Sequence, residues 1–298
     1  MSNCIVDMMN ERIDLDARTP VKAPETEHIP PSAFEGRDCT AVYWLGGGGF
    51  LVNARGTVLL VDPVLETRPG EPLVSCGGQK LLMPLPLGTG EVARCDRVLY
   101  THDDWDHACP DTARGLAGRD TPMLGSARVF ETLVKQGVKP GGFTVCHAGE
   151  AYEEGGVRIE VIPGDHPWQL IDEEAYGRPF YPEECVGYVV RTPDGGILFT
   201  GDTRLLPQHF HHPGITLLPL DVSRCVFHLG RPSAALLANR YPQAHLLPYH
   251  YGTMDFPECP GQEGGDPELV LRNVNGGWER AHVVAPGHPV ILREGRVE

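Results

Sequence analysis

The chain has 298 residues with 40 acidic and 25 basic side chains, which gives a formal net charge of −15 at pH 7. Its 41% hydrophobic and 22% charged residues are typical of a globular protein with a sizeable core. The acidic excess argues against binding to nucleic acid or to an anionic membrane, because both need clustered lysine and arginine. We therefore expect a small-molecule substrate, no nucleic acid and no membrane as partners, while a homo-oligomer is compatible with the sequence.

The sequence shows no secretory leader and no membrane-spanning segment. No apolar run approaches the ~20 residues that a transmembrane helix needs, and residues 1–16 lack the basic start and apolar core of a signal peptide. The nine cysteines are scattered, odd in number and without a CxxC pair. We expect them to be reduced thiols of a cytoplasmic protein.

The first part of the chain contains an extension and a group of strands. Residues 1–38 are polar and proline-containing, without a sustained period, and are predicted to form an N-terminal extension. A single domain is predicted over 39–298. It begins with short strands at 41–45, 50–53 and 57–61 in an antiparallel meander, the first two joined by a turn of four glycines.

The rest of the chain alternates strands with a few helices. Residues 64–95 are a long connection rich in glycine and proline, predicted to be a functional loop or lid, with an unstructured insertion as the alternative. Further strands are predicted at 97–101, 143–146, 157–162, 186–191, 197–200, 215–220, 244–249 and 290–293. Helices are predicted at 126–136, 233–239 and 267–274, the last with Asp266 as its N-cap. This pattern favours helices packed outside two sheets.

The most informative segment follows the strand at 97–101. Four side chains that can bind a metal lie within six residues there: His102, Asp104, Asp106 and His107. A loop at the end of a rigid strand can direct several side chains to one point. Imidazole and carboxylate groups together suit zinc, manganese or iron.

Three later strands also end in a histidine or an aspartate. His166 follows the strand at 157–162, Asp202 follows the strand at 197–200, and His250 follows the strand at 244–249. A single histidine at a strand end is commonly structural. Three such residues in the same topological position, after a dense cluster, predict one shared metal site.

The order of these residues resembles that of the metallo-β-lactamase superfamily, and most of all its ascorbate-6-phosphate lactonase-like branch. The resemblance rests on the ordered ligands and on the stretches YWLG (43–46), LLVDP (59–63), THD (101–103), FTGD (199–202) and PYHYG (248–252). It implies an α/β fold, a four-layer αββα sandwich, with two divalent metal ions in a cleft at one edge of the sheets.

The resemblance also implies which residue binds which metal. The first ion would bind His102, Asp104 and His166, the second would bind Asp106, His107 and His250, and Asp202 would bridge them. Asp62 would hold the ligand loop, residues 102–107, by hydrogen bonds. The alternative is a simple Asp-Pro turn at the strand end.

One residue departs from the family pattern HxHxDH, because Asp104 stands where the second histidine is expected. A carboxylate adds negative charge and a harder oxygen donor, which shifts the metal preference from zinc toward manganese or iron. This HxDxDH variant resembles the HxExDH motif of flavodiiron proteins and of some di-iron oxygenases on this fold.

These features predict a metal-dependent hydrolase that uses a hydroxide activated by two metals on an ester, lactone or phosphoester bond of a small molecule. Asp106 and His250 are the predicted catalytic residues, and Asp106 would orient the hydroxide or shuttle its proton. His228 and Tyr251 are predicted to contact substrate. The alternatives are a di-iron oxidase or oxygenase, suggested by Asp104, and a catalytically silent binding protein that keeps the fold.

Overall fold

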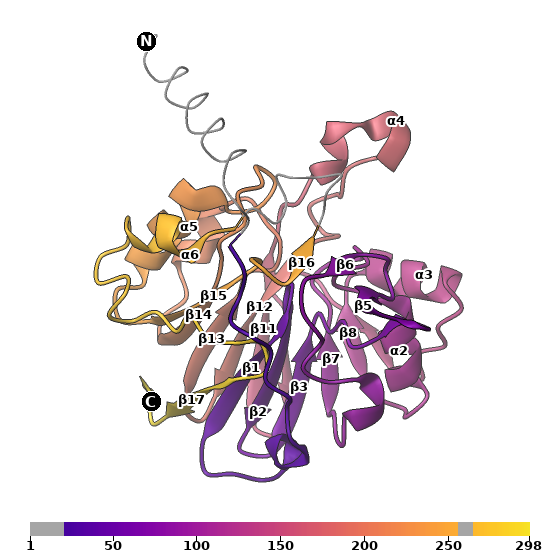
Figure 1. The fold of residues 1–298 in the computed structure, drawn as a ribbon, viewed down its shortest axis with the longest axis horizontal. Helices are drawn as coiled ribbons and strands as arrows, with labels where there is room; N and C mark the ends of the chain where they lie inside the picture. The colour runs from indigo at the N-terminus through magenta and orange to yellow at the C-terminus, as the bar shows by residue number, and fades with distance from the viewer. Residues whose placement is uncertain (1–20, 256–264) are drawn as a thin grey trace.

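The structure is a computed structural model that describes residues 21–255 and 265–298. Two large sheets face each other, with helices on both outer sides (Figure 1). The eight-stranded sheet has the order β18-β17-β1-β2-β3-β7-β8-β9, formed by Arg296–Val297, Pro289–Arg293, Thr40–Gly46, Gly49–Ala54, Thr57–Val61, Arg97–Leu99, Met123–Gly125 and Phe143–Val145. The six-stranded sheet has the order β10-β11-β12-β13-β14-β15, formed by Ala151–Glu154, Val157–Pro163, Val186–Thr192, Gly195–Phe199, Ile215–Asp221 and His245–Tyr249.

Strand β1 shows how the four layers arise from the sequence. Its side chains alternate between the two faces of the sheet, and both faces are buried. Val42 and Trp44 belong to the core shared with the six-stranded sheet, whereas Ala41 and Tyr43 belong to a second core. A strand buried on both faces has a continuous apolar sequence, which is why this segment was recognisable as a strand.

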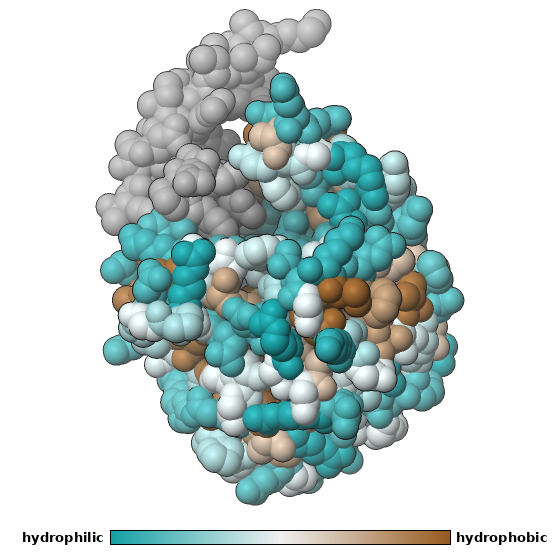
Figure 2. All heavy atoms as spheres, turned by 90° about the vertical axis from the view of Figure 1, so that its right-hand side faces the viewer, coloured by the Kyte–Doolittle hydropathy of each residue, from teal (hydrophilic) through white to brown (hydrophobic). Residues whose placement is uncertain are grey.

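Helices cover the outer face of each sheet. Helices α2 (Pro110–Ala117) and α3 (Ala127–Lys135) supply buried residues to the second core, and α5 (Gly230–Arg240) packs on the six-stranded sheet together with α6 (Pro267–Leu271). Figure 1 shows these two pairs on opposite sides of the molecule. Figure 2, which faces the α2 and α3 side, shows mainly hydrophilic side chains there. The predicted αββα sandwich is confirmed.

The predicted strands are present, with small changes at their ends. The glycine turn at 46–49 joins β1 to β2 as predicted. The helix predicted at 233–239 begins at Gly230, and the helix predicted at 267–274 ends at Leu271, with the Asp266 side chain accepting a hydrogen bond from Glu268 N. Helix α2 and strands β8, β10 and β18 were not predicted. Helix α2 was missed because Cys109, its N-cap residue, offers no side-chain hydrogen bond, although Pro110 at its first position and Asp111 in its first turn are typical of a helix start.

The connection at 64–95 is structured, so the alternative of an unstructured insertion is wrong. It forms β4 (Thr67–Arg68), β5 (Glu71–Ser75) and β6 (Lys80–Leu81), which make a small sheet with β16 (Met254–Asp255). Because β16 lies just after His250, this small sheet joins the insertion to the end of β15. Short helical turns complete the described chain: η1 (Pro31–Phe34), η2 (Thr89–Glu91), η3 (Trp168–Ile171), α4 (Glu173–Tyr176) and η4 (Pro207–Phe210).

Part of the predicted extension packs on the body of the protein. Ile29, Ala33 and Phe34 are buried in the second core, and Ala23 N donates a hydrogen bond to Gly252 O over 3.3 Å. The division into 1–38 and 39–298 stays a prediction. Among the described residues, the helices are too short or too polar to cross a membrane.

A disulfide links the insertion to the segment after the ligand loop. Cys76 and Cys109, 33 residues apart in sequence, are joined with a Cα–Cα distance of 6.6 Å. The expectation that all cysteines are reduced is therefore wrong for this pair. Sequence spacing could not reveal it, because the pairing depends on how the insertion folds back. Cys39, Cys95, Cys146 and Cys185 are free thiols, and Cys4 and Cys259 lie outside the described residues.

Replacing Cys76 by serine is expected to lower the free energy of unfolding by up to about 3–4 kcal/mol, because a closed loop of this size restricts the unfolded chain. Urea unfolding of the wild type and of Cys76→Ser, each with and without dithiothreitol, measures the effect. Dithiothreitol should bring the wild type to the level of the variant and leave the variant unchanged. Equal wild-type stability in both conditions would contradict the prediction.

Candidate metal centre

The two sheets bring their ligand-bearing strand ends to one edge. Strands β3 and β7 are parallel neighbours, and Asp62 and His102 follow them. Strands β13, β14 and β15 are also parallel neighbours, and they lead to Asp202, Asp221 and His250. The carboxyl ends of parallel strands lie at the same edge of a sheet, so residues far apart in sequence become neighbours there.

Potential metal ligands form three overlapping clusters among the described residues. Within each cluster the ligand atoms lie within 4.8 Å of one another. The clusters are His102–Asp104–His166, His102–His107–Asp202 and Asp202–Asp221–His228–His250. The first contains the three residues predicted to bind the first metal. The assignment of individual ligands to a metal stays a prediction.

Asp202 lies at the centre of these clusters. Its Oδ2 atom is 3.1 Å from His107 Nε2, 3.4 Å from His228 Nε2 and 4.0 Å from His166 Nε2. Its Oδ1 atom is 3.6 Å from His250 Nε2. A carboxylate with both oxygens facing different imidazoles has the arrangement that a bridging ligand requires.

Hydrogen bonds at Nδ1 orient several of the histidines, whereas His250 Nδ1 has no hydrogen-bond partner among the described residues. His107 Nδ1 lies 2.9 Å from Asp62 Oδ2, and His166 Nδ1 lies 2.9 Å from the carbonyl oxygen of Phe227. Each acceptor places the proton on Nδ1, so the lone pair is on Nε2, the nitrogen that faces the cluster.

Asp62 also holds the ligand loop, as its predicted role requires. It accepts hydrogen bonds from Thr101 N over 2.8 Å and from Thr101 Oγ1 over 2.6 Å. Since that hydroxyl donates to Asp62, its oxygen is left to accept from His102 Nδ1, 2.9 Å away. One buried carboxylate thus orients both His102 and His107.

Most of the described inward-facing atoms lack hydrogen bonds, the exception being the contact of His107 Nε2 with Asp202 Oδ2, and this is the observation that fits a metal. Among the described residues, the Nε2 atoms of His102, His166, His228 and His250 and Oδ1 of Asp202 are buried without a hydrogen-bond partner. Buried polar atoms are nearly always paired, and several unpaired ones facing each other indicate a missing partner. Nitrogen and oxygen donors in this number suit a transition-metal ion or zinc.

Charges in the cluster show what that partner would supply. Burial opposes protonation of His107, but the carboxylates of Asp202 and Asp62 outweigh burial and raise its pKa well above the ordinary value. Burial also opposes ionisation of Asp202, yet the imidazoles of His107, His228 and His250 keep its pKa well below the ordinary value. The carboxylates therefore attract positive charge, which a divalent cation would provide in place of protons.

The backbone is strained at two residues of the site. Asp62 has φ of +44° and His250 has φ of +60°, in the left-handed region that favours glycine. Strain of this kind persists where the surrounding structure imposes it, and it is concentrated at functional sites. Close packing also restricts Gly48, because a Cβ atom there would lie 2.3 Å from His107 Cε1.

The other predicted site residues lie in different surroundings. Asp106 is buried, but its carboxylate joins none of the three clusters within the described chain. Tyr251 is buried and its ring stacks on Trp44 at 5.3 Å, in the core between the sheets. Their predicted roles stay predictions. Sequence reasoning missed Asp221, although it ends an apolar strand in the same way as Asp202 and His250.

An aromatic side chain covers one side of the cluster. Phe180 is buried, and its ring centroid lies 5.8 Å from that of His102 and 6.1 Å from that of His166. The guanidinium carbon of Arg128, on α3, lies 4.1 Å from the Phe180 centroid. Glu184 holds this segment in place by hydrogen bonds from Arg178 at 2.6 and 2.7 Å. Phe180 thus lies over the rings of His102 and His166 on this side of the cluster.

The ion pair of Glu184 predicts a loss of stability in acid. Burial opposes its ionisation, but the hydrogen bonds from Arg178 and from the backbone of Tyr181, with the charge of Arg128, together outweigh burial and lower the pKa of Glu184 from 4.5 to about 2. Because the folded pKa is the lower one, the stabilisation is present above pH 4.5 and is lost as the pH falls toward 2. We expect about 2 kcal/mol, below the full linkage value, because Arg178 is half exposed. Urea unfolding at pH 7 and pH 2.5 should show a smaller acid-induced loss in Glu184→Gln than in the wild type, and equal losses would contradict this.

The fold and the clustered ligands define a metal-binding protein of the αββα class. A sequence model described as the beta-lactamase superfamily domain matches residues 57–251. The chain therefore belongs to the beta-lactamase superfamily.

Individual relatives agree with this membership. A metal-dependent hydrolase of Pyrobaculum arsenaticum is 25% identical over 220 residues, which cover 71% of this chain and 84% of that protein. Among solved structures, a metallo hydrolase from Ignicoccus hospitalis aligns with a TM-score of 0.63 and 16% identity over 86% of this chain and 99% of that one. CmlA, a diiron beta-hydroxylase from Streptomyces venezuelae, aligns with a TM-score of 0.60 and 16% identity over 86% of this chain and 54% of that one. Both structures share the fold.

Proposed function

We propose that this metal-dependent hydrolase of the beta-lactamase superfamily uses two divalent cations to cleave an ester, lactone or phosphoester bond of a small molecule. The observation that carries the proposal is the position of Asp202, whose two oxygens face four imidazoles from separate segments of the chain. A carboxylate in that position can serve two cations at once.

Side chains at the edge of the two sheets would hold the cations. His102, Asp104 and His166 would bind the first, His107 and His250 would bind the second, and Asp202 would bridge them. The unpaired Nε2 atoms support this set. When bound, the two cations lower the pKa of a water molecule and polarise the bond to be cleaved.

The protein's own groups would prepare the reaction. Asp62 keeps the imidazoles of His102 and His107 oriented, and Phe180 lies over one side of the cluster. We assign Asp106 the role of orienting the attacking water and accepting its proton. His250 stays the second predicted catalytic residue, in addition to its role as a metal ligand. The substrate we favour is a small anionic lactone or ester, as in the ascorbate-6-phosphate lactonase-like branch, because a cationic centre inside an acidic protein attracts anions locally.

The test is metal analysis followed by activity measurement. Protein purified without a chelator or a His tag is analysed for manganese, iron and zinc, and then assayed on lactones, esters and phosphodiesters after loading with each metal. We expect about two metal ions per chain, following from the ligand count, and hydrolysis of at least one substrate class. Protein that takes up no metal and cleaves nothing on the panel would overturn the proposal.

A second candidate, a di-iron oxidase or oxygenase, is favoured by one residue. Asp104 Oδ2 lies 3.2 Å from His102 Nε2 and 3.4 Å from His166 Nε2, so a carboxylate occupies the position of the family's usual histidine. Carboxylate donors suit iron. Bound iron with substrate-dependent oxygen consumption would support this function, and an active enzyme free of iron would exclude it.

A further inference from the structure

His228 faces the candidate metal centre without belonging to the family's ligand pattern. It lies between β14 and α5, is 2% exposed, and its Nε2 atom makes no hydrogen bond within the described residues. That atom lies 3.4 Å from Asp202 Oδ2, the carboxylate at the centre of the site. A buried imidazole nitrogen in this position needs a partner, because an unpaired buried polar group is costly.

A carboxylate fixes the other ring nitrogen of His228. Its Nδ1 atom lies 2.7 Å from Asp221 Oδ2, and Asp221 Oδ1 accepts a hydrogen bond from Ser223 N over 2.8 Å. Asp221 is fully buried at the end of β14. His107 has the same arrangement with Asp62, at 2.9 Å. An acceptor at Nδ1 directs the lone pair to Nε2, as is typical of histidines that bind a metal.

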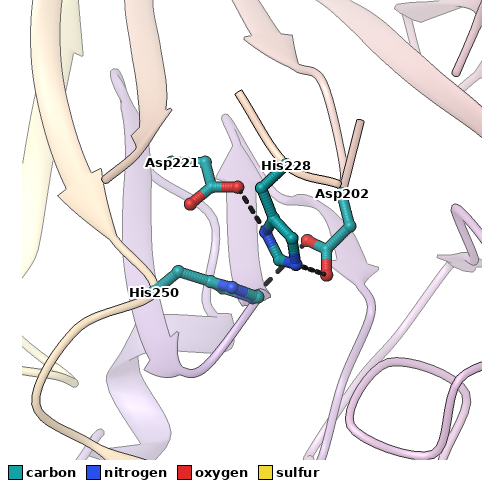
Figure 3. A group of neighbouring side chains, drawn as sticks. All are labelled: Asp202, Asp221, His228 and His250. Atoms are coloured by element: carbon teal, nitrogen blue, oxygen red, sulfur yellow. Dashed lines mark hydrogen bonds and ion pairs between the residues drawn. The ribbon is translucent and has the colours of Figure 1, made fainter. Parts of the chain in front are cut away.

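Figure 3 shows that His228 and His250 both direct their rings toward Asp202, while Asp221 lies behind His228. The ring centroids of His228 and His250 are 5.2 Å apart. Asp106, which the family pattern places on the second metal, joins none of the clusters in the described part of the chain. The cluster that includes His250 therefore gains a nitrogen donor from His228.

We propose that His228 is a ligand of the second cation and that Asp221 is its positioning residue. The inference rests on the proposed function, since it assumes a site for two cations, and it replaces the sequence expectation that His228 contacts substrate. Its chemical consequence is a second site richer in nitrogen than the first, which contains Asp104. The two sites would then differ in metal preference, and the second site would favour zinc over manganese.

The test compares metal binding by the wild type, His228→Ala and Asp221→Asn. Each chelator-treated protein is titrated with cobalt(II), followed by visible absorption, and its metal content is measured after dialysis against zinc. The wild type should bind two ions. In His228→Ala the affinity for one of them should fall at least about 100-fold, and in Asp221→Asn about 10-fold, because partners of metal-binding histidines contribute 10–100-fold. The cobalt spectrum should change in both variants, since each alters the donor nitrogen.

His245→Gln is the matched control. This histidine lies at the other end of β15 from His250, and its Nδ1 pairs with His282 Nε2 at 2.8 Å. It should bind both ions as the wild type does. Circular dichroism of every variant checks that the fold is intact, and added imidazole should restore the cobalt spectrum of His228→Ala.

The two proposals fail in different ways. A wild type that binds fewer than two ions would overturn the site for two cations, and with it the role given to His228. A wild type that binds two ions, beside a folded His228→Ala that binds both with unchanged affinity and spectrum, would overturn only the inference. A raised KM in that variant would then indicate the substrate contact predicted from sequence.

Discussion

Replacing Asp202 by asparagine is expected to abolish binding of both metal ions, with at least about a 100-fold loss of affinity at each site, because even the partners of metal ligands contribute 10–100-fold. Among the described carboxylates, Asp202 alone faces all four of His107, His166, His228 and His250, at 3.1–4.0 Å. Asparagine keeps the shape but has one oxygen and no charge, so it cannot serve two cations. The rate of hydrolysis should fall about 1,000-fold or more, or about 4 kcal/mol of transition-state stabilisation.

Metal content after dialysis measures the first effect, and kcat/KM on the best substrate measures the second. Asp194→Asn is the control, because Asp194 is also buried but lies at the other end of β13, where it pairs with Arg55 at 2.7 Å. Asp194→Asn should lower stability and leave metal content unchanged. An Asp202→Asn variant that retains two ions would show that Asp202 does not bridge.

Replacing Asp104 by histidine is expected to shift metal preference toward zinc by about 10-fold or more, since imidazole is a softer and uncharged donor. Asp104 is held between His102 and His166, and although burial opposes its ionisation, those imidazoles keep its pKa below the ordinary value. The exchange removes one negative charge and restores the family's usual histidine.

Competition dialysis against equal concentrations of manganese, iron(II) and zinc, followed by metal analysis, measures the shift. The neighbouring Asp103 supplies the control. Its Oδ2 accepts hydrogen bonds from Thr132 at 2.6 Å and Arg128 at 3.2 Å, so it is turned toward α3 and away from the cluster. Asp103→Asn removes the same charge from the same loop and should leave the ratio of bound metals unchanged. An unchanged ratio in Asp104→His would refute the prediction.

Much of the fold was predictable because the strands are local features of the sequence. Strands buried on both faces, such as β1 and β14, are continuous apolar runs with turns at their ends. Elements with weak local signals escaped prediction. Strand β8 has three residues, and α2 begins without a polar N-cap. The disulfide between Cys76 and Cys109 escaped for another reason, because it depends on the insertion folding back toward α2.

The candidate site was only partly predictable. The ordered residues His102, Asp104, His166 and Asp202 follow strands or lie in one motif, and the structure brings them together. Asp221 ends a strand in the same way, but its role becomes visible only through its contact with His228 Nδ1. Asp104 was identified from the motif spacing alone, and the structure agrees with this, because the neighbouring Asp103 accepts hydrogen bonds from Arg128 and Thr132 on α3.

The sequence by itself determined the approximate positions of most strands, the chemical nature of the donors and their order along the chain, because these are properties of single segments. Only the tertiary structure decided which nitrogen of a histidine faces the cluster and which group holds the other nitrogen, as with Asp62 at His107 Nδ1 and Asp221 at His228 Nδ1. The reason is that a ligand's orientation is set by hydrogen bonds to residues from other strands. The packing of the two sheets, and not the spacing of the motif, creates those contacts.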